Sequence, residues 1–386
     1  MKTIIELYDE RPIENVLGAE VFRPKELVIL CPAEVESTNV LAKSLRKYFE
    51  HRGCPIKVTV VPVSLLDAKK VEKQLRRVIE TREDCVIDIS GGTDAALFAA
   101  GCVDPDVPVI TYSRKKNTFF EIRNAPYARN LPCNVHLDAE SCFLMAGGTM
   151  LPGREDNETL RDRLDEIDRL FSVFKKYRRT WNRQISYIQQ ISSSEPGELM
   201  ADGARTVKSG RGSVTVEEEL LLDLADENLI HDLVLTDRSV SFRFPDEMVR
   251  FWLRDIGSVL ELQVYRSAVL AGCFDDVVLS AVVNWEGGTS QRDAVTNEID
   301  VVAVRGISPV FISCKTSEIR TEALNELAVL RDRFGGKGSR AIIVTSANPS
   351  RGRALMRMRA TELDIEVVEW SDVQTERLVT RLQMKV

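Results

Sequence analysis

Short β-branched runs alternate with helical stretches between Glu26 and Ile110, and this alternation constrains the fold more than any other feature. The runs are continuously apolar, which is typical of strands buried on both faces. Strands of this kind, separated by helices, form a parallel sheet covered on both sides. The expected strands are 27–30, 57–61, 85–89 and 107–110, with helices from Ser37, Asp67 and Thr93. The segment 1–150 is therefore predicted to be a Rossmann-like α/β domain.

Residues 151–245 are predicted to form a small connecting module. A Gly/Pro-rich segment, 147–153, marks the boundary. Charged residues with large apolar residues at helical spacing over 155–192 predict one long amphipathic helix and a shorter one. A Ser/Gly-rich loop is expected over 192–213, followed by a helix and a hairpin that turns at 236–239. Helices followed by a hairpin favour a winged-helix-like fold.

The order of the expected elements changes again in 246–386. A helix, three strands, a second helix and a further strand follow one another, and this succession is the core of restriction-endonuclease-like α/β folds. The expected elements are a helix over 247–270 with a break at Gly257, strands 276–285, 298–304 and 309–315, a helix over 319–334, and strands 341–345 and 365–368.

A carboxylate and a lysine lie on two adjacent expected strands of this last segment. Asp300 lies in the first apolar run, and Lys315 ends the second. A divalent cation needs fixed carboxylate oxygens, and a scissile phosphate needs a nearby ammonium group. The pair therefore predicts metal-assisted phosphodiester hydrolysis, with Mg²⁺ or Mn²⁺ as the ion because the ligands are oxygen atoms.

Two further carboxylates are candidates for the same site. Glu298 lies two residues before Asp300 and would project from the same face of the strand. Glu261 lies on the expected helix among apolar neighbours, where an unpaired charge is costly. The alternative is structural: Glu261 would pair with an arginine at a domain seam, and Lys315 would be an edge-strand solubility residue.

Two loops of the amino-terminal domain carry residues that suit an anionic ligand. The loop 89–94 ends a strand and opens a helix, so its glycines let main-chain N–H groups approach an anion. A second loop follows the first expected strand, and both reach the same edge of a parallel sheet. Ordinary helix capping is the alternative at both. The candidate ligand-binding residues are Pro32, Ser37, Thr38, Asn39, Ser90, Gly91, Gly92, Thr93, Asp94 and Arg114, with Tyr112 and Ser113 beside the last.

The charges are unevenly distributed along the chain. The net charge of −7 argues against wholesale coating of nucleic acid, but residues 331–360 hold eight Lys or Arg against one acid. Residues 175–183 mix cations with two aromatic residues. Such mixtures can neutralise phosphates and stack on unpaired bases, although a solvated helix face is the alternative.

Several classes of protein are excluded by composition. No run of eighteen apolar residues occurs, and the start of the chain is too short and too acidic for a signal peptide, so we expect a cytoplasmic protein that does not enter a membrane. The three histidines are far apart in sequence and no C-x-x-C pair occurs, so a zinc site has no local support.

Taken together and in order, these motifs resemble the CRISPR ancillary nucleases, which join an amino-terminal CARF domain to a carboxy-terminal PD-(D/E)xK nuclease through a winged-helix-like region. The resemblance covers nearly the whole chain. It rests on 89–93, on 297–300, and on 311–315 with the trailing 334–336. The offset from Asp300 to Lys315 resembles the spacing of the PD-(D/E)xK pattern, but Ser313 stands where that pattern has an acid. Glu326 resembles the migrated glutamate of some members, and Glu322 is its substitute.

The resemblance implies a homodimer whose paired CARF domains bind a cyclic oligoadenylate, most often the tetra-adenylate. Binding would switch on metal-dependent cleavage of DNA or RNA in type III CRISPR antiviral defence. The implied catalytic residues are Asp300, Lys315, Glu326 and Glu261, and the three carboxylates would hold the Mn²⁺ or Mg²⁺ ion.

Two alternatives remain open. A chain inactivated at Ser313 would be a ligand-responsive transcriptional regulator that works through the winged-helix-like module. A Rossmann-like domain that binds another nucleotide would instead indicate a repair or restriction nuclease. The sequence decides neither between DNA and RNA nor the ring size of the activator.

Overall fold

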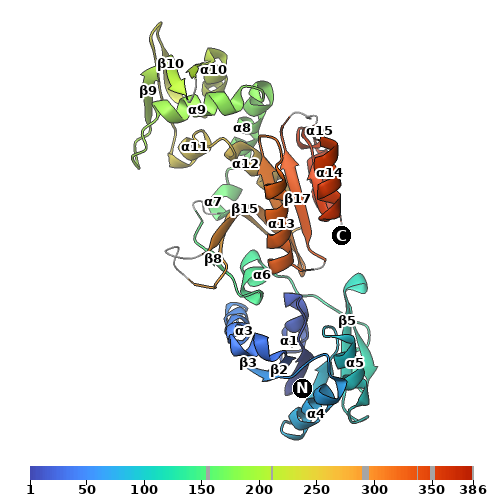
Figure 1. The fold of residues 1–386 in the computed structure, drawn as a ribbon. Helices are drawn as coiled ribbons and strands as arrows, with labels where there is room; N and C mark the ends of the chain where they lie inside the picture. The colour runs from blue at the N-terminus through green and yellow to red at the C-terminus, as the bar shows by residue number, and fades with distance from the viewer. Residues whose placement is uncertain (154–156, 210–211, 289–294, 337, 348–352, 385–386) are drawn as a thin grey trace.

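The structure, a computed structural model, describes residues 1–153, 157–209, 212–288, 295–336, 338–347 and 353–384. Three bodies follow one another in space, with the amino-terminal α/β domain at one end, the carboxy-terminal α/β domain in the middle and the connecting module at the other end (Figure 1). Among the described residues, no helix is both long and apolar enough to cross a membrane.

The amino-terminal domain contains a seven-stranded sheet of order β3-β2-β1-β4-β5-β6-β7. The first five of these are parallel, as predicted, and β6 and β7 add an antiparallel edge that the sequence interpretation missed. The strands are β1 (Thr3–Leu7), β2 (Glu26–Cys31), β3 (Lys57–Pro62), β4 (Cys85–Asp88), β5 (Val109–Ser113), β6 (Thr118–Arg123) and β7 (Leu131–Pro132). The central strand β1 was also not predicted. Its position makes the order Rossmann-like, with the direction of the strand order reversing between β1 and β4.

Helices cover both faces of this sheet. Apolar side chains of α4 and α5 pack on one face, and those of α1 and α3 pack on the other. The side chains of Asp67 and Thr93 cap the starts of α4 and α5, which explains why these helices begin where the sequence predicted. The helical segments are η1 (Pro12–Asn15), α1 (Leu17–Phe22), α2 (Ala33–Ser37), α3 (Val40–His51), α4 (Ala68–Glu80), α5 (Asp94–Cys102), η2 (Arg114–Lys116), η3 (Pro126–Ala128) and α6 (Ala139–Met145).

The carboxy-terminal domain has a six-stranded sheet of order β18-β17-β16-β15-β14-β8. Strands β14, β15 and β16 are antiparallel, and β16, β17 and β18 are parallel. The strands are β8 (Thr149–Leu151), β14 (Asp276–Asn284), β15 (Thr296–Arg305), β16 (Ser308–Lys315), β17 (Arg340–Thr345) and β18 (Ile365–Val368). The helices are α11 (Glu247–Trp252), α12 (Ser258–Leu270), α13 (Thr321–Phe334), α14 (Arg353–Glu362), α15 (Trp370–Val373) and α16 (Arg377–Gln383).

This domain follows the predicted order of elements, including the helix break at Gly257. One strand differs. β8 pairs with β14, so a segment expected at the end of the amino-terminal domain contributes a strand to the carboxy-terminal sheet. A boundary at residue 150 therefore cuts through β8.

Among its described residues, the connecting module holds four helices and two small sheets. The antiparallel pair β12–β13 is the predicted hairpin, but the expected loop over 192–213 is wrong, because this segment contains β9, β10 and the first half of β11. Helices beside a three-stranded sheet of order β12-β13-β9 make the module winged-helix-like. Its elements are α7 (Asn157–Arg161), α8 (Leu164–Tyr177), α9 (Trp181–Ile191), β9 (Met200–Ala204), β10 (Thr206–Ser209), β11 (Gly212–Thr215), α10 (Glu218–Asp226), β12 (His231–Leu235) and β13 (Ser239–Arg243).

Shared apolar cores join the three bodies. One cluster of buried side chains runs from the amino-terminal sheet through α6 to one face of the carboxy-terminal sheet. A second cluster joins the opposite face of that sheet to the module. In the first cluster the ring of Phe143 lies edge-on to that of Phe334, with centroids 5.1 Å apart, and 6.4 Å from that of Phe311. The carboxy-terminal sheet is thus packed against both neighbours.

Truncation of Phe143 is expected to destabilise both α/β domains together. Phe143→Ala removes a fully buried ring from the shared core and should lower the free energy of unfolding by about 3–5 kcal/mol. Urea unfolding followed by circular dichroism measures this change. As the control, Leu355→Ala removes an apolar side chain that is 74% exposed and should change the free energy by less than about 0.5 kcal/mol. A loss below about 1 kcal/mol for Phe143→Ala would contradict the shared core.

Candidate functional sites

Asp300 and Lys315 come together where β15 and β16 separate. The paired register of these strands ends at Val301 and Ile312. Beyond this pair, Oδ2 of Asp300 accepts a hydrogen bond from the main-chain N–H of Cys314 at 2.5 Å. The carboxylate therefore links the two strands where their main-chain hydrogen bonds have ended. Nζ of Lys315 lies 3.6 Å from the same oxygen. The two residues predicted from the sequence therefore do share one site.

Ser313 is part of this site. Its hydroxyl donates to Oδ2 of Asp300 at 3.1 Å. The residue that replaces the acid of the PD-(D/E)xK pattern thus faces the same space, where it supplies a polar oxygen but no negative charge.

Glu261 is a carboxyl group without a partner beside this pair. Its side chain folds back over the start of α12, where a Cβ on Gly257 would lie 2.6 Å from Oε1. Burial, together with the negative charges of Asp300, Asp255 and Glu298, raises the pKa of Glu261 to about 9, although the positive charge of Lys315 opposes the shift. Among the described residues, Glu261 has no hydrogen-bond or salt-bridge partner, so the arginine of the structural alternative is not found there.

Glu326 and Glu322 do not join the group. Both are exposed on α13. Oε1 of Glu326 accepts a hydrogen bond from Nδ2 of Asn297 at 2.6 Å, and Glu322 lines a separate small cavity between the starts of α13 and α14. In the part of the chain that the structure describes, no three His, Cys, Asp or Glu side chains are arranged to hold one metal ion. The expected triad of Glu261, Asp300 and Glu326 is therefore not assembled in this conformation.

Asp300 and Glu261 nevertheless fit a divalent cation. The negative charge of Asp300 opposes ionisation of Glu261, and the Glu261 side chain is half-buried with no ion-pair partner among the described residues. Mg²⁺ sites in proteins commonly use one or two carboxylates and complete the shell with water.

Most cations of the two basic segments are engaged with other residues. In the segment 175–183, Trp181 is fully buried and the hydroxyl of Tyr177 donates to Asp223, so both rings have structural roles. In this conformation the ring of Trp181 is therefore not accessible for stacking on bases, which was one of the two interpretations of this segment. In the segment 331–360, Lys337 and Arg351 lie outside the described residues, and four arginines form ion pairs: Arg331–Asp332, Arg340–Glu366, Arg357–Glu369 and Arg359–Glu362.

Two adjoining cavities lie at the ends of β1, β2 and β4, where the strand order reverses. Their volumes are about 550 and 570 Å³, and both are lined by Tyr8, Asp9, Glu10 and Glu34. The first is also lined by three predicted ligand-binding residues, Pro32, Gly92 and Thr93, and the second is also lined by Thr38. The two predicted loops therefore meet, at the place where α/β sheets of this type bind ligands.

The other predicted ligand-binding residues have various positions. Ser37, Asn39 and Asp94 are exposed beside the cavities. Gly91 is buried against Leu7 and Asp9. The hydroxyl of Ser90 bonds to Asp88 and accepts from the N–H of Tyr112, so it faces the interior of the sheet.

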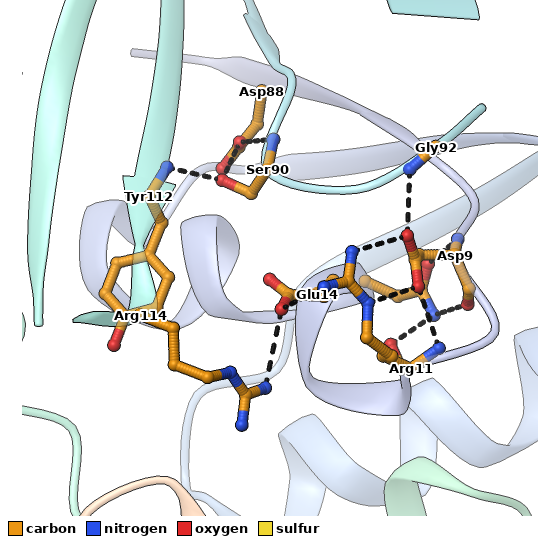
Figure 2. A network of polar contacts seen from close by, with 9 residues as sticks. Asp9, Arg11, Glu14, Asp88, Ser90, Gly92, Tyr112 and Arg114 are labelled. Carbon is orange, nitrogen blue, oxygen red and sulfur yellow. Dashed lines mark hydrogen bonds and ion pairs between the residues drawn. The ribbon is translucent and has the colours of Figure 1, made fainter. Parts of the chain in front are cut away.

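A polar network that the sequence interpretation missed begins at the loop of Gly92 (Figure 2). Asp9 accepts the N–H of Gly92 at 3.1 Å and forms a two-pronged ion pair with Arg11. Burial alone would raise the pKa of Asp9, but the hydrogen bonds from Arg11 and Gly92 lower it. Arg11 and Arg114 each lie 3.4 Å from Oε1 of Glu14, whose pKa is raised by burial despite both cations. The clue in the sequence was the set of charged residues directly after the short apolar run 3–7.

Both arginines of this network also contact the carboxy-terminal domain. They lie against the loop between α13 and β17. A Cβ on Gly336 would be 3.4 Å from Arg11, and one on Gly338 would be 3.0 Å from Cδ of Arg114. Gly336 and Gly338 have φ angles of +61° and +95°, which side chains disfavour. Arg114, predicted to bind ligand, lines neither cavity and lies instead at this junction.

Two buried acids lie beneath the ligand loops. Glu6 and Asp88 are in register on the neighbouring strands β1 and β4, and both pack against Gly18. Burial raises the pKa of Asp88 to about 7, although hydrogen bonds from Ser90 oppose the shift. Burial and the charge of Asp88 raise the pKa of Glu6 well above its usual value. Both carboxyl groups therefore keep their protons to a higher pH than exposed carboxyl groups do.

Comparisons with known proteins match the carboxy-terminal domain in sequence and the whole chain in fold. Residues 245–382 match the family model of the Card1-like endonuclease domain. No curated protein matches the chain in sequence. Two solved structures are similar over 99% of this chain and 97% of theirs. Protein VC1899 from Vibrio cholerae has a TM-score of 0.73 and is 17% identical in sequence. Can2 from Sulfobacillus thermosulfidooxidans, solved in complex with cyclic tetra-adenylate, has a TM-score of 0.68 and is 13% identical. These likenesses show the fold of the whole chain.

The buried acid Asp88 should make stability depend on pH. Because its pKa is higher in the folded protein than in the unfolded chain, its contribution is fully present below about pH 4 and is lost as pH rises through about 7. Asp88→Asn removes this dependence. Between pH 4 and pH 8 the free energy of unfolding of the wild type should therefore fall by about 1–3 kcal/mol more than that of Asp88→Asn. Urea unfolding at each pH measures both values.

The control for this experiment is Asp106→Asn, which alters an exposed aspartate of the same domain. Its pH profile should follow that of the wild type. An Asp88→Asn profile parallel to that of the wild type would contradict the assignment.

Proposed function

We propose that this chain, whose residues 245–382 form a Card1-like endonuclease domain, is a metal-dependent nuclease of type III CRISPR defence that a cyclic oligoadenylate activates. The observation that carries the proposal is the site at the ends of β15 and β16. There Asp300 and Lys315 lie 3.6 Å apart within the matched domain, beside the unpaired carboxyl group of Glu261.

Asp300 and Glu261 are the proposed ligands of the Mg²⁺ or Mn²⁺ ion. When bound, such an ion stabilises charge on the phosphate and makes water a better nucleophile at neutral pH. Because metal ligands must be deprotonated, Glu261 would give up its proton on binding the ion, and the positive charge of the ion would then offset the cost of desolvating the carboxylate. Ser313 and the N–H of Cys314 fix the orientation of the Asp300 carboxylate.

Lys315 is the proposed phosphate-binding and water-positioning residue. It is the cation closest to Asp300, and its side chain is 35% exposed, so a phosphate can reach it. Its ammonium group can neutralise the charge that develops on the phosphate during cleavage. The substrate is DNA or RNA, and both must be offered in the assay.

The proposed activator is cyclic tetra-adenylate, bound at the cavities beside β1, β2 and β4. Two observations support it. The similar structure Can2 holds this ligand. The cavities carry Asp9, Glu10 and Glu34, whose carboxylates can accept hydrogen bonds from the amino groups of adenine, and Gly92 allows close approach of the main chain.

We further propose that the protein acts as a homodimer. A cyclic ligand built from identical units presents equivalent groups to two copies of the same loops. Large apolar side chains are exposed in this domain: Leu66, at the wall of the first cavity, is 82% exposed, and Phe98, on the helix α5 that begins after the cavity residue Thr93, is 69% exposed. Exposed groups of this size are typical of surfaces that a partner covers.

The polar network of Figure 2 is the proposed link between activator and nuclease. It runs from Gly92 through Asp9, Arg11 and Glu14 to the loop that follows α13. A ligand that binds one arrangement of this loop more tightly shifts the protein towards that arrangement.

The proposed function is tested by incubating the protein with Mn²⁺ and labelled single- and double-stranded DNA and RNA, with and without cyclic tetra-adenylate. Cleavage should require both the metal ion and the activator. Asp300→Asn should reduce it by roughly 100-fold or more, because the ion would lose one of its two proposed carboxylate ligands and with it the stabilisation of charge on the phosphate.

Glu326→Gln separates the two possible ligand sets. Since Glu326 contacts Asn297 and not Asp300, its substitution should reduce cleavage less than Asp300→Asn does. Cleavage that survives in Asp300→Asn contradicts the proposed site. A wild type that cleaves nothing, but whose DNA binding responds to cyclic tetra-adenylate, would favour the transcriptional regulator.

Disruption of the network should uncouple activator binding from cleavage. Arg11→Ala removes the ion pairs to Asp9 and Glu14 and the contact with Gly336. The ratio of activated to basal cleavage rates should fall by about tenfold. The matched control is Arg129→Ala, which removes an ion pair to Glu121 within the amino-terminal domain. An unchanged ratio in Arg11→Ala, at saturating activator, would rule out this route.

A further inference from the structure

We propose that Arg178, in the turn between α8 and α9, is a positioning residue for the nuclease reaction. It fixes the main chain at the end of β16, where Lys315 lies. The inference rests on the proposed function, because Arg178 acts through Lys315. It assigns part of the active-site support to the connecting module, outside the endonuclease domain that the family model matches.

The first contact path runs through the main chain of β17. Lys315 and Thr345 form the last pair of the parallel strands β16 and β17. The carbonyl oxygen of Lys315 accepts the N–H of Ser346 at 3.1 Å and the hydroxyl of Thr345 at 3.0 Å. Nη1 of Arg178 donates to the carbonyl oxygen of the buried Ser346. Ser346 thus joins the two residues: its carbonyl oxygen accepts from Arg178, and its N–H donates to the carbonyl oxygen of Lys315.

A second contact path runs directly to the residue after Lys315. Nδ2 of Asn182, in the first turn of α9, donates to the hydroxyl of Thr316 at 3.4 Å. The module thus holds the chain on both sides of the strand end, through Ser346 and through Thr316.

The turn that carries Arg178 is itself rigidly packed. The guanidinium group lies over the ring of Trp370, 4.8 Å from its centroid. Trp370 packs against Phe174, which lies edge-on to the fully buried Trp181. Because these rings come from α8, α9 and α15, they hold the turn against the carboxy-terminal domain.

This support matters because Lys315 must stay close to Asp300. Lys315 is the last residue of β16, and from there its ammonium group lies 3.6 Å from the Asp300 carboxylate. A displacement of about 1 Å in such a group can reduce a rate about 100-fold. Loss of the Arg178 contact should therefore lower the rate of the chemical step and leave substrate binding nearly unchanged.

The test compares Arg178→Ala and Arg178→Lys in the full chain, with Mn²⁺, activator and the nucleic acid that the wild type cleaves. Arg178→Ala should lower kcat by about 10- to 100-fold and change KM by less than about twofold. Arg178→Lys keeps a charged donor and should recover most of kcat. The matched control is Arg183→Ala. Arg183 lies in the first turn of α9 and forms an exposed ion pair with Glu217, and its substitution should keep the wild-type kcat. A wild-type kcat in Arg178→Ala, or a loss confined to KM, overturns the proposal.

Two further variants keep the test decisive if Arg178→Ala does not fold. Asn182→Ala and Thr316→Val each remove the same hydrogen bond, the one between Asn182 and Thr316 that forms the second contact path. Each should lower kcat, and the double variant should lower it no further than either single one. Independent effects, or none, overturn the proposal. Lys315→Ala is measured alongside: if it stays active, the proposed function itself fails, whereas an inactive Lys315→Ala with a fully active Arg178→Ala rejects only the positioning role.

Discussion

The separation of β15 from β16 at Asp300 is the constraint on which the proposed chemistry depends. At this point the carboxylate of Asp300 replaces a main-chain acceptor and holds the N–H of Cys314, so its position is set by the sheet itself. Lys315 and Ser313 reach the same oxygen from the adjacent strand. The half-buried carboxyl group of Glu261 then lies beside a fixed negative charge, and a cation between them would remove the electrostatic cost to both.

The surrounding architecture connects this point to the rest of the chain. One apolar cluster is continuous between the two α/β domains, and another joins the carboxy-terminal sheet to the module. Arginine side chains lie at each boundary between the bodies. Arg11 and Arg114 lie against the loop after α13, and Arg178 donates a hydrogen bond to the carbonyl oxygen of Ser346, directly after β17. A rearrangement at the cavities therefore has packed side chains through which to reach the sheet of Asp300, and the module is positioned to support the same sheet from its other side.

The sequence predicted those parts of the fold that have strong periodic patterns. Long apolar strands and amphipathic helices identified both α/β domains, and Asp300 and Lys315 could be paired because they lie near the ends of adjacent runs. Short strands were missed, namely β1, β6, β7, β8 and those between Met200 and Thr215, and in the last group glycine and serine lower the strand signal. The contacts of Arg11, Arg114 and Arg178 could not be predicted, because each joins residues far apart in the chain. The position of Glu326 beside Asn297 could not be predicted, since helical spacing does not specify which strand end a helix faces.

The central claim is that Asp300 and Glu261 hold one divalent cation beside Lys315. Anomalous diffraction from crystals of the full chain grown with Mn²⁺ tests it most directly, because the manganese position is observed independently of any activity. The account predicts one strong peak within bonding distance of both carboxylates, about 2.0–2.6 Å from their oxygens. A peak at Glu326 instead, or no peak near Asp300 while other sites are occupied, would contradict it.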